Sequence, residues 1–194
     1  MTLIAIVGMT GSGKSELARI FEERGFRTIR FGDVTDDMLR QRGLPLTEEN
    51  EKRLRESLRK EHGMEAYAKL NLPRIEAAIQ KNDVIIDGLY SWEESLFLNG
   101  EFGRKLVVLA AYAPPGIRYE RLSGRKVRPL TIDQARARDR GEIEHLNKAA
   151  PIAMADYTIR NVGTLLDLRD EVDVFLEWMK EMEAREHNGK ADMG

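Results

Sequence analysis

One short segment near the start of the sequence has the composition of a phosphate-binding loop. Residues 8–15 read GMTGSGKS and fit the pattern G-x-x-x-x-G-K-[ST]. A polyphosphate carries several negative charges in a small volume, so its loop must turn many backbone N–H groups inward, which glycines permit. Lys14 would reach the β- and γ-phosphate oxygens, and the Ser15 hydroxyl would ligate Mg²⁺. The predicted phosphate-binding residues are Gly8, Met9, Thr10, Gly11, Ser12, Gly13, Lys14 and Ser15.

Two aspartates that end apolar segments are candidate partners of this loop. Asp87 follows the apolar run Val84–Ile86, and at the carboxyl edge of a parallel sheet it would hold Mg²⁺ directly or through water. Asp33 closes another apolar segment, which ends in RFGD at 30–33, and it would position or deprotonate an acceptor hydroxyl. Each also has a plainer interpretation: Asp87 begins a turn before Gly88, and Asp33 caps the helix that follows it.

A basic block lies in the second half of an otherwise slightly acidic chain. Between positions 121 and 140 it comprises Arg121, Arg125, Lys126, Arg128, Arg136, Arg138 and Arg140. Such a run usually forms a solvated helical face. Phosphoryl transfer, however, develops charge on the migrating group and requires water to be excluded, and a flap that carries guanidinium groups meets both needs. We expect at least one catalytic arginine here, with Arg121, Arg125 and Arg138 as the leading candidates and Arg140 as an alternative.

Five short apolar segments predict the strands that position these residues. They occupy residues 3–7, 28–31, 84–86, 106–112 and 157–159, with polar, helix-like stretches between them. The uninterrupted run at 3–7 is typical of a strand buried on both faces of a parallel sheet. After the glycine loop, apolar residues recur at helical spacing until Gly25 ends the helix. This order predicts an α/β fold with a doubly wound parallel sheet of about five strands.

Two segments do not fit simple alternation of strands and helices. Residues 34–82 are too long for one crossover, and since Thr47 predicts a helix start and Gly63 its end, we expect a helical insertion there. Residues 121–141 hold the basic block, and we expect them to form a lid. The last helix is predicted from Leu165 to about Arg185. The predicted organisation is a single domain over 1–180, with its core in 1–33, 83–120 and 142–180, and a frayed tail at 181–194.

Composition narrows the classes of function. The chain has 194 residues, of which 42% are hydrophobic and 33% charged, and a formal net charge of −2. These values predict one globular domain without the basic footprint of a nucleic-acid-binding protein. The longest apolar runs are too short to span a bilayer and the first lacks a basic leader, so we expect a cytoplasmic protein that makes no membrane contact. Cysteine is absent, which excludes disulfides and thiolate chemistry.

With these motifs in place, the sequence resembles the P-loop kinases of the nucleoside-monophosphate-kinase group. It more closely resembles the archaeal adenylate-kinase-related proteins, which are also described as dephospho-CoA-kinase-like. The landmarks are residues 8–26, FGDV at 31–34, VIIDG at 84–88, RLSGR at 121–125 and ADYTIRNVG at 155–163. In those families the last segment lies near the donor adenine, which implies that Asn161, Val162 and Gly163 contact the base. Alternatively, Asn161 and Gly163 form the turn into the last helix.

The resemblance implies a Mg²⁺-dependent phosphotransferase that uses ATP and a small-molecule acceptor. The acceptor would be a nucleoside monophosphate or a molecule like dephospho-CoA, bound by residues 34–82 and covered by the lid. Two departures leave its identity open. Asp36 stands where such kinases carry an acceptor-gripping arginine, and Tyr90 and Ser91 stand where they carry another. Arg40, one helical turn beyond Asp36, would restore the first contact.

Two other functions stay open beside this leading hypothesis. One is an ATP-dependent regulatory NTPase or switch that binds a protein partner, with ATPase activity in place of transfer. Guanine specificity is not expected, because residues 147–150 read NKAA and lack the aspartate of the guanine signature. The other is an RNA-binding or RNA-modifying kinase that uses the basic lid, and the acidic balance of the chain argues against it.

Overall fold

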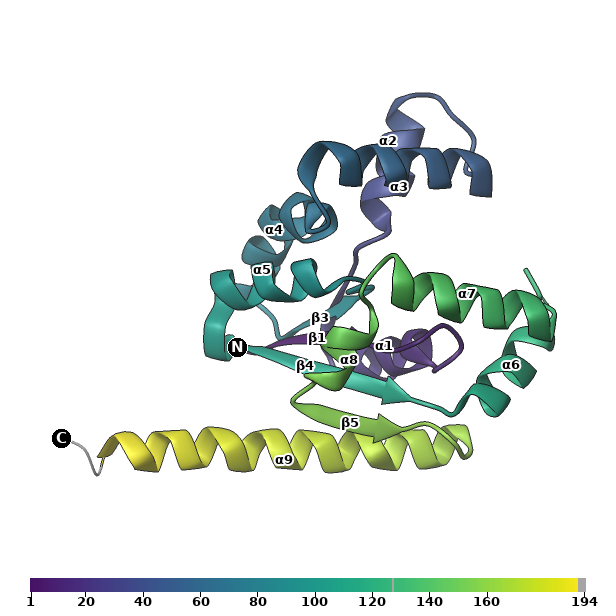
Figure 1. Ribbon diagram of the computed structural model, residues 1–194. Helices are drawn as coiled ribbons and strands as arrows, with labels where there is room; N and C mark the ends of the chain where they lie inside the picture. The colour runs from purple at the N-terminus through teal and green to yellow at the C-terminus, as the bar shows by residue number, and fades with distance from the viewer. Residues whose placement is uncertain (127, 192–194) are drawn as a thin grey trace.

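A parallel five-stranded sheet forms the centre of the molecule (Figure 1). The computed structural model describes residues 1–126 and 128–191, with side chains described as far as Arg185. The strands are β1 (Leu3–Val7), β2 (Arg27–Arg30), β3 (Val84–Asp87), β4 (Leu106–Tyr112) and β5 (Tyr157–Arg160). Their order across the sheet is β2-β3-β1-β4-β5, and all neighbouring pairs are parallel. The predicted doubly wound sheet is confirmed, with every strand within a residue of its expected bounds.

The central strand β1 is buried on both faces. Leu3, Ala5 and Val7 face one apolar core, and Ile4 and Ile6 face the other, all with no exposed surface. Because neither face meets water, the strand needs no polar alternation, which explains its continuous apolar sequence.

Helices cover both faces of the sheet. They are α1 (Lys14–Glu23), α2 (Asp33–Gln41), α3 (Glu48–His62), α4 (Ala66–Ile79), α5 (Trp92–Phe102), α6 (Pro115–Ser123), α7 (Ile132–Glu144), α8 (Ala149–Ala153) and α9 (Leu165–Ala191), with a 3₁₀ turn at Gly103–Lys105. The first and last helices supply the core on one face, and α2 to α5 supply the core on the other. In Figure 1, α2 and α3 rise above the sheet, whereas α6 and α7 flank the end toward which the strand arrows point.

The expected insertion is helical but smaller than predicted. Helix α3 begins after Thr47, whose hydroxyl accepts a hydrogen bond from the Asn50 N–H at 3.3 Å, and it ends before Gly63 as predicted. Helix α4, by contrast, packs on β2 and β3, and its Ala68 and Ile75 lie fully buried in the core. This helix is the ordinary crossover between those strands, so the inserted helices are only α2 and α3.

The predicted tail differs from the structure, whereas the lid stays a prediction. Residues 121–141 comprise the end of α6, a connecting segment and most of α7, and the two helices pack against each other. Val127 within this segment lies outside the described residues. Helix α9 continues to Ala191, so the expected tail is helical over 181–191, and 192–194 lie outside the described residues. In the part of the chain that the structure describes, no helix combines the length and apolar character needed to cross a membrane.

Candidate nucleotide and acceptor site

The glycine-rich loop joins β1 to α1 at the carboxyl edge of the sheet. Gly8, Gly11 and Gly13 have φ angles of 148°, 87° and 96°, a region that side-chain-bearing residues rarely adopt. Close packing adds a second requirement for glycine. A Cβ on Gly13 would lie 1.9 Å from Asn161 Nδ2, and one on Gly8 would lie 2.5 Å from the Ala111 carbonyl oxygen. The loop therefore keeps its shape through both backbone conformation and contact with the ends of β4 and β5.

The Lys14 side chain folds back across the mouth of the loop. Its ammonium group donates to the Gly8 carbonyl at 2.8 Å and to the Met9 carbonyl at 3.2 Å. Burial and the nearby Lys148 ammonium lower the pKa of Lys14 to about 7, although the carboxylates of Glu142 and Asp87 oppose the shift. An arriving phosphate would therefore meet a pre-positioned cation whose charged form it stabilises.

Asp87 and Ser15 are the candidate ligands for a Mg²⁺ ion beside the loop. Asp87 ends β3, in register with Ile6 and Arg30 on the neighbouring strands. Burial raises the pKa of this half-buried carboxyl, and the Lys14 ammonium opposes that shift. The Ser15 hydroxyl is exposed at the start of α1. Mg²⁺ commonly takes one or two protein oxygens together with phosphates and water, so Ser15 and Asp87 fit its donor chemistry.

Asp33 is the first residue of α2 and lies near this pair. Its carboxylate is 3.3 Å from Arg30 Nε, and its charge adds to the upward shift of the Asp87 pKa. The helix N-cap is Gly32, with no side-chain capping bond, so capping does not explain the aspartate. Among the described residues no cluster of three or more metal-ligating side chains occurs, and the candidate metal ligands are therefore those that would share the ion with phosphate.

The segment after β5 is attached directly to the loop. Asn161 Nδ2 donates to the Ser12 carbonyl at 2.9 Å. Arg121 donates to the Asn161 backbone carbonyl at 3.0 Å and to its side-chain oxygen at 3.3 Å. The asparagine amide is thus bound within the protein, while Val162 is 40% exposed beside it. A nucleotide base in this place would meet Val162, Gly163 and the Arg121 side chain before the amide of Asn161.

Sequence reasoning missed a carboxylate that reaches into the loop. Glu142 of α7 accepts hydrogen bonds from the Thr10 backbone N–H at 3.2 Å and from the Thr10 hydroxyl. Lys148 Nζ lies 2.9 Å from the same carboxylate and Arg138 Nε lies 3.4 Å from it. Burial opposes its ionisation, but the Lys148 charge and the bonds from Thr10 and Lys148 outweigh burial and hold the pKa of Glu142 at about 2. The Glu142 carboxylate is therefore ionised at neutral pH, whereas burial lowers the pKa of Lys148 and the charge of Glu142 opposes that shift.

Lys148, which is only 1% exposed, is a second residue that the sequence did not single out. Its ammonium lies 5.1 Å from the centre of the Tyr90 ring. Asn147, directly before it, has a φ of 49°, and asparagine is enriched among non-glycine residues in this region. The turn after α7 directs Lys148 inward. An asparagine just after a predicted helix was the sequence feature that could have indicated this turn.

Arg118 is a third missed residue, and it fastens α6 to α7 and to the loop. It is 4% exposed and forms two bonds to the Asp139 carboxylate, at 2.7 and 2.6 Å. The same guanidinium donates to the Thr10 carbonyl at 3.0 Å and to the Ala113 carbonyl at 3.1 Å. It lies just before the basic block that the sequence analysis selected, and its role is to position the loop.

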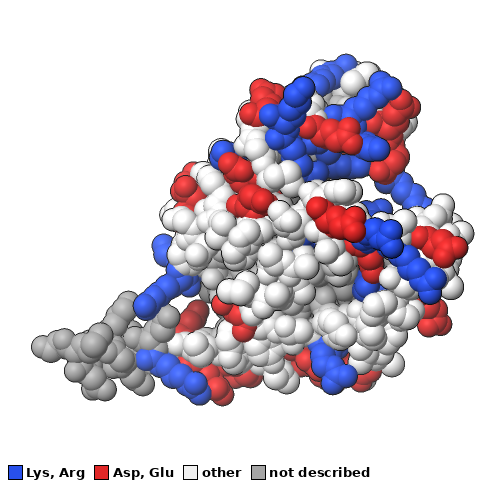
Figure 2. Space-filling model, viewed as in Figure 1, with Lys and Arg blue, Asp and Glu red and all other residues white. Residues whose placement is uncertain are grey.

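A cleft of about 1040 Å³ opens between α3 and α7 beside the loop. Figure 2 shows charged side chains crowded over α2 and α3, above the hollow that faces α7. Its basic lining consists of Arg30, Lys52, Arg55, Arg59, Arg125, Arg128 and Arg138. Glu142 lines the cleft and also contacts Thr10, so the cleft and the loop share a wall. The structure thus places Arg125 and Arg138 in the cleft, whereas Arg121 lies beside Asn161.

Most basic groups in the cleft are paired with carboxylates, and Arg59 differs from them. Arg55 lies 3.0 Å from Glu48 and 3.3 Å from Glu51, and Arg128 lies 3.2 and 3.6 Å from the same two carboxylates. The Nε of Arg59 is buried and has no hydrogen-bond partner among the described residues. Its guanidinium lies 5.4 Å from the centre of the Tyr67 ring, inside the cleft wall.

The positions that depart from the family pattern have structural roles. Asp36 pairs with Arg30 at 3.2 Å. Ser91 caps α5 in a reciprocal capping box with Glu94. Arg40 pairs with Asp37 at 3.2 Å and is not among the residues that line the cleft. The expectation that Arg40 replaces the missing arginine is therefore not supported, and the basic lining comes chiefly from α3 and from the segment between α6 and α7 instead.

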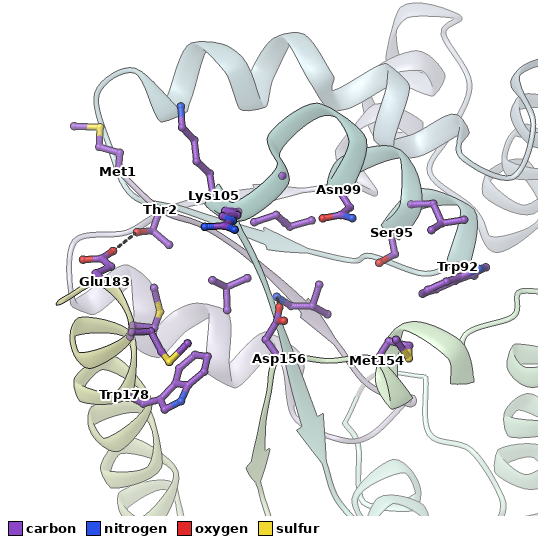
Figure 3. Close-up of a pocket in the computed structure, with 18 residues that line it drawn as sticks. Met1, Thr2, Trp92, Ser95, Asn99, Lys105, Met154, Asp156, Trp178 and Glu183 are labelled. Carbon is purple, nitrogen blue, oxygen red and sulfur yellow. Dashed lines mark hydrogen bonds between the residues drawn. The ribbon is translucent and has the colours of Figure 1, made fainter. Parts of the chain in front are cut away.

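A second cleft, of about 1010 Å³, lies at the amino-terminal edge of the sheet (Figure 3). Trp178 of α9 and Trp92 of α5 face it from opposite sides, and Met154 lies between α8 and the opening. Thr2, at its rim, donates from its hydroxyl to Glu183 at 3.3 Å. Because ligands of open α/β sheets bind at the carboxyl ends of the strands, this cleft is separate from the nucleotide site.

The parallel sheet and the glycine-rich loop between β1 and α1 define a protein of the P-loop kinase-like class. A gluconokinase from Sinorhizobium meliloti superposes with a TM-score of 0.60 and 17% identity, covering 95% of this chain and 97% of that one. A shikimate kinase from Bacteroides thetaiotaomicron superposes with a TM-score of 0.59 and 13% identity, and the match covers 92% of this chain and 98% of that one. At these identities the likeness concerns the fold.

Sequence relatives identify the family within that class. The family described as an AAA domain matches residues 4–147. A UPF0200 protein from Thermococcus gammatolerans is 35% identical and covers 90% of this chain and 94% of its own length. Another UPF0200 protein, from Aeropyrum pernix, is 38% identical, and the match covers 87% of this chain and 89% of that protein. The chain belongs to the UPF0200 family of P-loop kinase-like proteins.

Proposed function

We propose that this protein is a kinase that transfers the γ-phosphate of ATP to a small anionic acceptor in the cleft between α3 and α7. The observation that carries the proposal is the shared wall. Glu142 touches the Thr10 backbone and lines the arginine-rich cleft, so a donor phosphate in the loop would face a molecule in the cleft. Two binding sites that meet at one point are what direct transfer requires.

The proposed roles follow from where the side chains lie. The backbone of residues 8–15 cradles the phosphates, and Lys14 neutralises the transferring group. Arg125 and Arg138, which line the cleft, stabilise the charge that develops on it, and Arg121 holds the donor side next to Asn161. Mg²⁺, held by Ser15 and Asp87, would supply further charge neutralisation when bound.

The chemical step exchanges one phosphorus–oxygen bond for another. The bond from the γ-phosphorus to the β,γ-bridging oxygen breaks, and a bond to the acceptor oxygen forms. ADP leaves with the bridging oxygen. When the acceptor is a hydroxyl, it would have to reach the edge of the cleft beside Gly32, where Asp33 orients it and accepts its proton. When the acceptor is a phosphate, no base is needed, and Asp33 acts through Arg30, its partner at 3.3 Å.

The acceptor is proposed to be anionic because the cleft is lined by guanidinium groups and because Arg59 Nε has no partner among the described residues. Arginine binds phosphate and carboxylate through paired N–H groups. Candidate acceptors are nucleoside monophosphates and molecules like dephospho-CoA. Hydroxy acids resembling gluconate or shikimate are also candidates, since structural neighbours are named for them.

The test is an ADP-release assay over a panel of these acceptors with Mg²⁺ and ATP, with product detection by mass spectrometry. Acceptor-dependent ADP release and a phosphorylated product are expected. Lys14→Ala should lower kcat by about 10²- to 10³-fold, as loss of one transition-state donor does elsewhere, while thermal unfolding stays unchanged. Slow ATP hydrolysis with no phosphorylated acceptor in the panel would favour the regulatory ATPase, and normal turnover by Lys14→Ala would overturn the site assignment.

A further inference from the structure

Four hydrogen-bond donors converge on one carboxylate inside the phosphate-binding loop. The Thr10 N–H, the Thr10 hydroxyl, the Lys148 ammonium and the Arg138 guanidinium all lie against Glu142. The glutamate side chain is 8% exposed and that of Lys148 is 1% exposed. A backbone N–H, a hydroxyl, a lysine and an arginine are the groups that proteins use to bind a phosphate.

The position of Lys14 indicates which phosphate this carboxylate resembles. In loops of this type the lysine reaches the β- and γ-phosphates, while the N–H groups near the helix hold those closer to the nucleoside. Here the Lys14 ammonium lies against the carbonyls of Gly8 and Met9, at the strand end of the loop. Thr10 adjoins that end, so the Glu142 carboxylate occupies the region of the terminal phosphate.

We propose that Glu142 stands in for the terminal phosphate of ATP when no nucleotide is bound, and that Lys148 is a second phosphate-binding lysine that passes from Glu142 to ATP. This inference rests on the proposed nucleotide site. ATP displaces the Glu142 carboxylate, and its γ-phosphate takes over the bonds from Thr10, Lys148 and Arg138. ADP has no group at that position, so Glu142 keeps its partners in the ADP complex.

A purely structural ion pair would not explain this arrangement. A buried pair rarely stabilises a fold more than apolar residues of the same size. Here the pair also brings a second ammonium close to Lys14, and the repulsion contributes to the lowered pKa of Lys14. Two lysines beside one anion cost stability in the free protein, whereas they suit a γ-phosphate, which carries more negative charge than one carboxylate.

The exchange gives the protein a way to distinguish ATP from ADP. ATP must break the contacts of Glu142 but gains Lys148 and Arg138, while ADP does neither. Because Glu142 and Arg138 lie one turn apart on α7, release of the carboxylate frees the arginine that also lines the acceptor cleft. Binding of ATP is thereby linked to whether the Arg138 guanidinium is free of Glu142 at the wall of the acceptor cleft.

The experiment compares dissociation constants for a non-hydrolysable ATP analogue and for ADP, measured by calorimetry with Mg²⁺ on the full chain. Glu142→Gln removes the competing charge and should tighten ATP-analogue binding about tenfold or more, with a much smaller effect on ADP. Lys148→Met should weaken the ATP analogue by a similar factor and leave ADP nearly unchanged. Glu144→Gln is the matched control, since Glu144 is exposed on the same helix and lies 4.0 Å from Arg140.

Glu142→Gln leaves the buried Lys148 without its counter-ion, so thermal unfolding is followed in parallel. The double variant Glu142→Gln/Lys148→Met removes both charges of this ion pair while keeping Arg138 and Lys14, and it should bind the ATP analogue more weakly than Glu142→Gln alone. An unchanged ratio of ATP-analogue to ADP affinity in all three variants would overturn the inference while leaving the nucleotide site intact. Failure of the wild type and every variant to bind either nucleotide would overturn the proposed function, and this inference with it.

Discussion

The nucleotide half and the acceptor half of the site are built in different ways. The proposed nucleotide half is one continuous segment, residues 8–15, whose backbone N–H groups would bind the phosphates and whose neighbours are buried. The proposed acceptor half is made of side chains from α3, α7 and the segment before α7, and its Arg128–Glu48 pair joins residues eighty positions apart. Recognition by backbone can be encoded in one motif, whereas recognition by side chains depends on how distant elements meet.

The two halves differ equally in how firmly they are held. Around the loop, Ser12, Asn161 and Lys148 are all less than 9% exposed. In the cleft, the side chains of Arg128 and Glu48 are 61% and 64% exposed. Exposed ion pairs contribute little to stability and weaken in salt. The nucleotide half should therefore be rigid, and the acceptor half should adjust to what it binds.

The largest expected effect comes from breaking the anchor of the nucleotide half. Asp139→Ala leaves the buried Arg118 guanidinium without its carboxylate, which should lower the free energy of unfolding by about 3–5 kcal/mol. Chemical denaturation measures this loss. Asp133→Ala on the same helix is the control, because the Asp133 side chain is 93% exposed. If the two variants unfolded at the same denaturant concentration, the nucleotide half would not be the more firmly held one.

The next effect separates acceptor binding from nucleotide binding. Arg59→Met keeps most of the side-chain volume but removes the charge, and it should raise the acceptor KM by about 10- to 100-fold, the value of one or two charge-assisted hydrogen bonds. The KM for ATP should change little. Arg53→Met is the matched control, since Arg53 is 74% exposed on the same helix and pairs with Glu49. An equal rise in both KM values would show that the two halves are not separable.

A third effect concerns pH and belongs to the nucleotide half alone. The pKa of Lys14 is lowered to about 7 by burial and Lys148, and a bound phosphate raises it again. ATP binding should then take up a proton above pH 7, and affinity should fall up to about tenfold per pH unit as pH rises through that value.

Calorimetry in buffers of different ionisation enthalpy measures this proton uptake. Lys14→Arg supplies the control, because a guanidinium stays charged throughout this range and removes the protein's share of the pH dependence. An identical pH profile for the two proteins would assign the titration to the nucleotide itself and not to Lys14.

The smallest effect is expected at the contact between α3 and the segment before α7. Arg128→Ala removes an exposed ion pair to Glu48 and a longer, partly exposed one to Glu51, and should change the free energy of unfolding by about 1 kcal/mol or less. That difference should shrink further in 1 M salt. A loss as large as that of Asp139→Ala would mean that the acceptor half is fixed as firmly as the loop.

The sequence predicted the parts of the molecule that are local in the chain. The strands, the loop and the ends of α3 follow from apolar runs, glycines and a capping threonine, each of which acts within a few residues. The position of Asp87 at the end of a strand was predicted for the same reason, whereas its role as a metal ligand stays a prediction. The length of α9 was underestimated because polar residues after Arg185 do not by themselves end a helix.

The parts that were missed depend on contacts between distant residues. Arg118, Glu142 and Lys148 sit among many charged residues, and only the packing of α7 over the loop distinguishes them from a solvated face. Arg59 likewise lies on a helix rich in arginine and glutamate, and its special feature is a buried Nε that has no hydrogen-bond partner in the part of the chain that the structure describes. Such a feature cannot be predicted from spacing, because it depends on which carboxylates the other arginines have already taken.

The contact between Gly13 and Asn161 has a consequence for how this chain can change over time. The absent side chain of one residue is the space that the other occupies, since a Cβ at position 13 would lie 1.9 Å from the asparagine nitrogen. A replacement at either place is therefore constrained by the other, although most of the chain separates them. Because the φ of 96° at Gly13 also requires glycine, descendants of a common ancestor should keep position 13, and any substitution should fall at position 161.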